Sequence, residues 1–65
     1  MLEYTNSRMA ELINEHIHSE RDRAILTRRL IDGLTFERLA EEFALSVRQT
    51  KNIVYREEEM LFQYI

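Results

Sequence analysis

The scarcity of turn-forming residues is the strongest constraint on the fold of this chain. Among 65 residues there is no proline and a single glycine, Gly33. Small sheet-rich domains need such residues at their tight turns, whereas long helices with brief connections need few of them. Hydrophobic residues make up 45% of the chain, which is too apolar for a disordered segment. We therefore expect one all-α domain over residues 1–65.

Apolar residues recur at the spacing of one helical face in four stretches. In the first stretch these residues are Met9, Leu12, Ile13, His16 and Ile17. The predicted helices run from residue 6 to about 18, from the cap at Ser19 to before Gly33, over 36–43, and from 47 to about 62. Gly33 stands where a left-handed cap would end the second helix.

Capping residues mark the helix starts. Asn6, Ser19, Thr35 and Ser46 each precede or open a predicted helix, and their side-chain oxygens can accept an otherwise unpaired amide. Only about three residues separate the third helix from the fourth. This arrangement predicts a helix-turn-helix unit over residues 35–56, without a winged element.

Charge is distributed unevenly along the chain. The formal net charge is −3, yet residues 46–56 contain three bases and no acid, whereas residues 57–59 are all glutamate. Arginine and lysine can contact guanine edges or phosphates, and glutamine and asparagine can pair with adenine. The side chains expected to project from the start of the last helix are Arg48, Gln49, Lys51, Asn52, Tyr55 and Arg56. An ordinary solvated helix face is the alternative to a DNA-contacting face, and the helix-turn-helix spacing favours the DNA-contacting face.

One stretch resembles a known family. The run Asp32-Gly33-Leu34-Thr35 through Leu39-Ala40-Glu41 to Leu45-Ser46-Val47-Arg48-Gln49 is similar to region four of bacterial sigma factors. The resemblance covers roughly residues 19–62. It implies a helical domain that reads the promoter −35 element with its last helix and touches a flap of core RNA polymerase.

The resemblance also implies roles for particular residues. Val47, Arg48, Lys51 and Asn52 match base- and phosphate-contacting positions, and the helix starts at Thr35 and Ser46 offer free amides to phosphate. Two positions depart from the family pattern: Ala44 replaces the usual glycine, and Thr50 replaces an aliphatic residue, which predicts looser packing of the last helix. Because the region that binds the −10 element is missing, we expect a small stand-alone regulator, such as one from a phage or mobile element.

Other classes of function are disfavoured. The chain has no cysteine, and His16 and His18 point in different directions on a helix, so we expect no metal site and no cofactor. The serines are explained as helix-start residues, so we expect neither catalysis nor a small-molecule substrate. No apolar run approaches the ~20 residues that span a bilayer, and no signal peptide is evident, so we expect a cytoplasmic protein that joins the nucleoid when bound to DNA.

The apolar C-terminus is a candidate interface. Its members are Met60, Leu61, Phe62, Tyr64 and Ile65, and Leu2 and Tyr4 could join it. Some of these residues could instead close over the first helix as core. A homodimer would place two recognition helices on one face of DNA, and RNA polymerase is the alternative second contact.

The expected function is sequence-specific binding of double-stranded DNA in transcription regulation. The rival is a protein-interaction module that contacts RNA polymerase or a sigma factor and binds little DNA itself. The acidic net charge of the chain favours the rival, because phosphate contacts supply much of DNA affinity. The basic cluster at the start of the last helix favours DNA.

Overall fold

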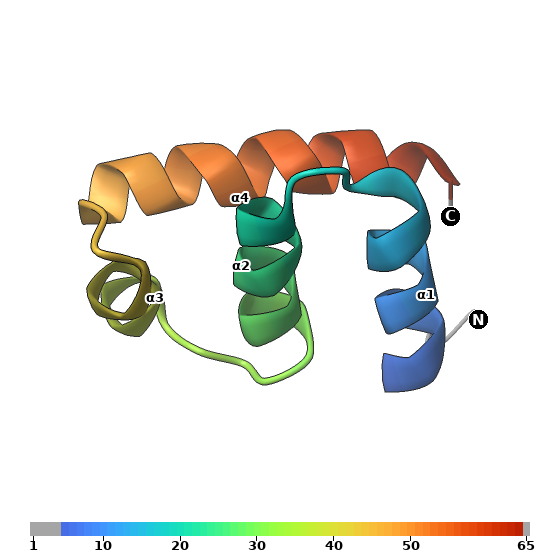
Figure 1. Cartoon of the computed structure of the whole chain (residues 1–65), viewed down its shortest axis with the longest axis horizontal. Coiled ribbons are helices and arrows are strands. Elements are labelled where there is room, and N and C mark those ends of the chain that lie inside the picture. The colour runs from blue at the N-terminus through green and yellow to red at the C-terminus, as the bar shows by residue number, and fades with distance from the viewer. Residues whose placement is uncertain (1–4, 65) are drawn as a thin grey trace.

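The computed structural model describes residues 5–64 and shows an all-α fold. Four α-helices are followed by one short 3-10 helix, and no strand occurs within residues 5–64. Figure 1 shows their arrangement. The elements are α1 (Asn6–His16), α2 (Glu20–Leu30), α3 (Phe36–Phe43), α4 (Val47–Leu61) and η1 (Phe62–Tyr64).

All four α-helices begin at a capping hydroxyl. The side-chain oxygens of Thr5, Ser19, Thr35 and Ser46 each accept a hydrogen bond from the backbone amide three residues later. Each bond pairs an amide that the helix itself leaves without a partner. The caps at Ser19, Thr35 and Ser46 were expected from the sequence and are confirmed.

The first helix differs from the prediction in its capping residue and in its C-terminal end. Thr5, rather than Asn6, is the cap, and Asn6 is the first helical residue. The helix ends at His16 because the backbone of Ile17 turns to the extended region, with φ −103° and ψ 117°. Ile17 is nevertheless fully buried, so its place in the apolar pattern reflects core packing after the helix has ended.

Helix α4 is the packing partner of the other three α-helices. In Figure 1 it runs along the length of the molecule, above α1, α2 and α3. Ile53, Val54 and Leu61 of α4 are buried in the core. The remaining buried core residues come from the other helices and the α1–α2 connection, and they are Leu12, Ile13, Ile17, Ile25, Leu26 and Leu39. Each of the other α-helices therefore contacts α4, and α1 and α3 also pack against α2.

The connection between α3 and α4 is short and closed by hydrogen bonds. Ala44 adopts the left-handed conformation, with φ 55° and ψ 45°. The amide of Leu45 donates to the carbonyl of Ala40 at 2.9 Å, and the side chain of Leu45 packs against the core. This is the usual closure of a helix by a left-handed residue, carried here by alanine in place of glycine.

The described part of the chain contains no helix that is both long and apolar enough to cross a membrane. Leu2, Tyr4 and Ile65, which the sequence suggested as members of an interface, lie outside the described residues.

The two left-handed positions predict opposite effects of substitution. Ala44→Gly should raise the free energy of unfolding by roughly 0.5–1 kcal/mol, because glycine adopts a positive φ without the steric cost that alanine bears. Gly33 has φ +75° and open space where a Cβ would lie, so Gly33→Ala should lower stability by about 1 kcal/mol through the backbone alone.

Urea denaturation followed by circular dichroism would measure both changes. Ala10→Gly, within α1, is the matched control, and it should lower stability by about 1 kcal/mol because glycine is unfavourable in a helix interior. If Ala44→Gly were destabilising like this control, the left-handed assignment at Ala44 would be wrong.

Candidate functional site

The first half of α4 presents a polar, basic ridge to solvent. Arg48, Asn52 and Tyr55 are exposed and follow one another at i, i+4 and i+7, so they share one side of the helix. Lys51 is exposed on the flank of this ridge. Within residues 5–64, neither Arg48 nor Lys51 forms an ion pair. Their charges are therefore not neutralised by a described acid.

The ring of Phe36 supports one flank of this ridge. The Tyr55 ring meets it edge-on, with centroids 5.7 Å apart, and Lys51 Nζ lies 5.6 Å from its centroid. The guanidinium of Arg29 lies 4.1 Å from the same centroid, while Arg29 Nη1 donates to the carbonyl of Leu34 at 2.8 Å. Cation–π contacts of this kind favour a fixed position for the cation. Two cations from different helices are thereby held at the start of α3.

The sequence did not reveal this cluster. Phe36 fits the apolar spacing of its helix, as a core residue would, and nothing close to Arg29 in the sequence connects it with Phe36. The structure shows that Phe36 is half-buried and in contact with Tyr55. In the sequence, the only indication of this cluster is an aromatic residue directly after a helix cap, with basic residues in the helices before and after it. Many helical domains share that pattern, so the cluster can be identified only from the tertiary contacts.

Three of the expected DNA-contacting side chains are engaged in helix capping. Thr35 accepts from the amide of Arg38 at 3.2 Å. Ser46 and Gln49 form a reciprocal capping box, in which Ser46 Oγ accepts from the Gln49 amide and Gln49 Oε1 accepts from the Ser46 amide, both at 3.0 Å. Any contact that these side chains make to a ligand would use the Gln49 amide nitrogen or the hydroxyl protons. The half-buried Val47 follows as the first residue of α4.

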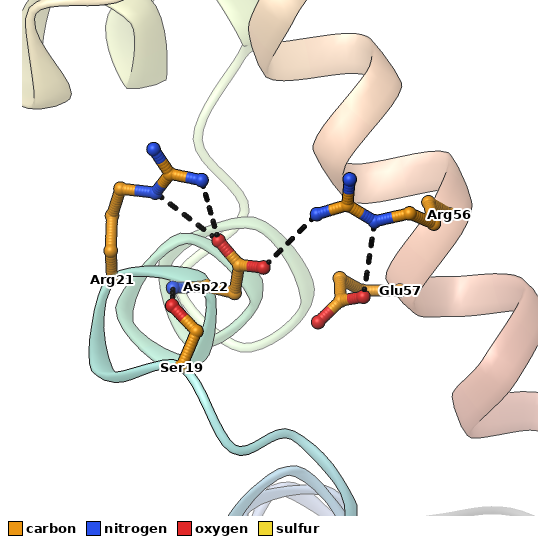
Figure 2. Close-up of polar contacts among 5 residues, drawn as sticks. All are labelled: Ser19, Arg21, Asp22, Arg56 and Glu57. Carbon is orange, nitrogen blue, oxygen red and sulfur yellow. Dashed lines mark hydrogen bonds and ion pairs between the residues drawn. The ribbon is translucent and has the colours of Figure 1, made fainter.

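Arg56 is tied to acids, unlike Arg48 and Lys51. Figure 2 shows its guanidinium between Asp22 of α2 and Glu57 of its own helix. Arg56 Nη2 lies 3.2 Å from Asp22 Oδ2, and Arg56 Nε lies 3.4 Å from Glu57 Oε1. The sequence predicted that Arg56 contacts a DNA phosphate. In the structure its guanidinium joins α4 to α2, and this role competes with a phosphate contact.

A second ion-pair network fixes α3 against α2. Arg28 binds both carboxylate oxygens of Glu42, at 2.8 and 2.9 Å, and also donates to Asp32 at 3.0 Å. A bidentate arginine–carboxylate pair of this kind fixes the relative orientation of the two side chains and is stronger than a single hydrogen bond. The hydrogen bond from Arg28 lowers the pKa of Glu42 below its ordinary value, and the bonds to Glu42 and Asp32 raise the pKa of Arg28.

Thr50 fits its buried position better than the sequence suggested. It is fully buried, and its hydroxyl donates to the carbonyl of Ser46 at 2.9 Å. The polar atom of this side chain is therefore paired within α4, so the threonine does not leave an unsatisfied group in the core.

The C-terminal segment divides between core and surface. Leu61 is fully buried and Met60 is partly buried against the core, as expected if some of these residues are core rather than interface. Phe62 and Tyr64 are 46% and 53% exposed. Tyr64 stacks on His16 of α1, with ring centroids 3.7 Å apart. The exposed apolar area here is thus smaller than the sequence predicted.

The described residues offer no enclosed site. No pocket forms among residues 5–64, and in the same span no three metal-ligating side chains lie together. Comparison with protein-family models, curated proteins and solved structures found no match to this chain.

The Arg28–Glu42 pair predicts a stability that depends on pH. Because the folded-state pKa of Glu42 is lowered, its contribution is present above the unfolded pKa, near 4.5, and is lost as pH falls through the folded value. Glu42→Gln should therefore lower Tm at pH 7. The difference in Tm between this variant and the unaltered protein should become smaller below about pH 4.

Thermal unfolding between pH 3 and pH 7 would measure this difference. Glu41→Gln is the matched control, because Glu41 is exposed and has no ion pair within residues 5–64. A Tm difference for Glu42→Gln that stayed constant down to pH 3 would contradict the assignment.

Proposed function

We propose that α3 and α4 form a helix-turn-helix unit that binds double-stranded DNA, with the first half of α4 in the major groove. The observation that carries this proposal is the grouping of Arg48, Lys51, Asn52 and Tyr55. They are exposed on the first half of one helix, and neither cation has an ion-pair partner within residues 5–64. An exposed helix with guanidinium, ammonium and amide groups matches the donors and acceptors of that groove.

The placement of each side chain suggests its role. Arg48 and Asn52 lie one helical turn apart on the outward ridge, where each can reach a base edge. Lys51 lies on the flank, against Phe36, where it is suited to a phosphate at the edge of the groove. Thr35 caps the start of α3 directly before Phe36, and the first-turn amides that this cap does not use can add a phosphate contact.

The resemblance to sigma region four supports the same function. The similar residues include Thr35, Ser46, Val47 and Arg48, which belong to the caps and first turn described above. We infer a regulator of transcription, with RNA polymerase as a candidate protein partner. No chemical step and no cofactor belongs to this function.

The basic surface is limited in extent. Glu59 continues the outward ridge of α4, and Glu57 and Glu58 occupy the adjoining positions. Acidic side chains at that end would repel DNA phosphates. A single molecule would therefore contact few phosphates, and firm binding would need a second contact from a homodimer or from RNA polymerase.

A protein-interaction module is the second candidate, and one observation favours it. The half of α4 that carries three glutamates leads directly to the exposed rings of Phe62 and Tyr64. Exposed aromatic residues of this kind are common at protein interfaces. In this alternative the fold is kept, DNA binding is weak, and the acidic end contacts RNA polymerase or a sigma factor.

Substitutions in α4 separate base contacts from phosphate contacts. Arg48→Ala should weaken specific binding by about 1–3 kcal/mol and relax the preference at one base pair. Lys51→Ala should weaken binding to all sequences alike and reduce the salt slope by about one unit. Fluorescence anisotropy with specific and random duplexes across a salt series would measure both.

Arg8→Ala is the matched control, because it removes the same charge from α1, where Arg8 is already paired with Glu11 at 3.0 Å. It should change DNA affinity little. Equal losses for Arg8→Ala and Lys51→Ala would show a general charge effect rather than a contact surface on α4.

The exposed rings near the C-terminus predict a homodimer. We expect sedimentation equilibrium at micromolar concentration to give a dimer for the unaltered protein and a monomer for Phe62→Glu/Tyr64→Glu, because a two-fold contact repeats the same surface on both chains. Arg8→Glu, at an exposed site in α1, controls for added acidic charge. A monomer for the unaltered protein, with and without DNA, would exclude the homodimer and leave RNA polymerase as the partner.

A further inference from the structure

The buried carboxylate of Asp22 links α2 to α4. Asp22 is only 4% exposed, although it stands in the first turn of α2. Each of its oxygens has its own arginine: Oδ1 accepts from Nε and Nη2 of Arg21, both at 3.2 Å, and Oδ2 accepts from Nη2 of Arg56 at 3.2 Å. Figure 2 shows the carboxylate between the two guanidinium groups.

The two arginines are not equivalent. Arg21 is the neighbour of Asp22 in sequence, whereas Arg56 comes from the third turn of α4 and bridges 34 residues. If Arg56 left this position, Oδ2 of a buried carboxylate would lose its partner, which is costly in a site that water reaches poorly. Glu57 adds a second acid against the same guanidinium, at 3.4 Å.

Arg56 would otherwise extend the basic ridge of α4. It lies one helical turn after Asn52, on an exposed position, so a free guanidinium there could reach a phosphate beyond those near Arg48 and Lys51. Between Asp22 and Glu57, however, its charge is already compensated. While Arg56 remains paired with these acids it neutralises no phosphate, so it releases no counterion from DNA and adds nothing to the affinity or its salt dependence.

We propose that Asp22 is a positioning residue that withholds Arg56 from the DNA backbone and thereby sets the C-terminal edge of the DNA-contacting surface on α4. This inference rests on the proposed DNA-binding function. It assigns Asp22 a role in DNA affinity although its side chain touches no DNA, and it removes Arg56 from the phosphate contacts expected from the sequence.

Two single variants and their combination test this role of Asp22 in DNA affinity. Arg56→Gln in the otherwise unaltered protein should change the Kd for a duplex and its salt slope no more than Arg8→Ala does, because both remove a cation that is already paired with an acid. Asp22→Asn should release Arg56, tighten binding about fivefold at 0.1 M salt, and steepen the salt slope by about one unit. In the double variant Asp22→Asn/Arg56→Gln, this gain should disappear.

Glu20→Gln is the matched control for charge. Glu20 is exposed, lies two residues from Asp22 in the same first turn of α2, and has no ion pair within residues 5–64. Its substitution removes the same negative charge without releasing an arginine. A gain for Asp22→Asn that exceeds the gain for Glu20→Gln would come from a released arginine, either Arg21 or Arg56. Loss of that gain in Asp22→Asn/Arg56→Gln would assign it to Arg56, whereas equal gains for Asp22→Asn and Glu20→Gln would overturn the inference.

Anisotropy titrations with one duplex, across a salt series, would measure all variants after circular dichroism has shown that each is folded. If Asp22→Asn fails to fold, Arg56→Gln is compared with the two other cation variants: a change no larger than that of Arg8→Ala supports the inference, and a loss equal to that of Lys51→Ala overturns it. That loss would leave the proposed function intact. Failure of the unaltered protein to bind any duplex would overturn the proposed function, and the inference with it.

Discussion

The burial of one face of α4 is the interaction on which the rest of this structure depends. Ile53, Val54 and Leu61 form part of the core, and α1, α2 and α3 all contact this helix. In so small a domain, no second core exists among the described residues to hold the helices independently. Because a helix has 3.6 residues per turn, burying this face directs Arg48, Asn52 and Tyr55 to the opposite side. The candidate site is thus a geometric consequence of the core.

Ion pairs then decide which of the exposed cations are available. Arg28 is bound to Glu42 and Asp32, Arg56 to Asp22 and Glu57, whereas Arg48 and Lys51 have no acidic partner within residues 5–64. Net charge and local charge counts do not distinguish these cases. The acidic net charge of the chain is therefore compatible with a basic surface on α4, because Asp22 and Glu42 are paired with arginines of other helices.

Much of the fold could be predicted because its signals are local. Helix caps and apolar spacing depend on residues a few positions apart, and the caps at Ser19, Thr35 and Ser46 were expected for that reason. The contacts of Asp22 and Phe36 depend on tertiary packing. Asp22 resembled an ordinary acid near a helix start, and nothing within a few residues of it indicates Arg56, 34 positions away. The break at Ile17 was missed because its apolar side chain continues the helical spacing after the backbone has left the helix.

Selection of bound duplexes from a random pool, at one fixed salt concentration, tests the central claim most directly. We expect an enriched sequence motif for the unaltered protein. Arg48→Ala should lose the preference at one position of that motif, while Arg8→Ala should keep the whole of it. Recovery of unenriched DNA with the unaltered protein, under conditions where the protein is folded, would contradict the claim that α4 reads DNA.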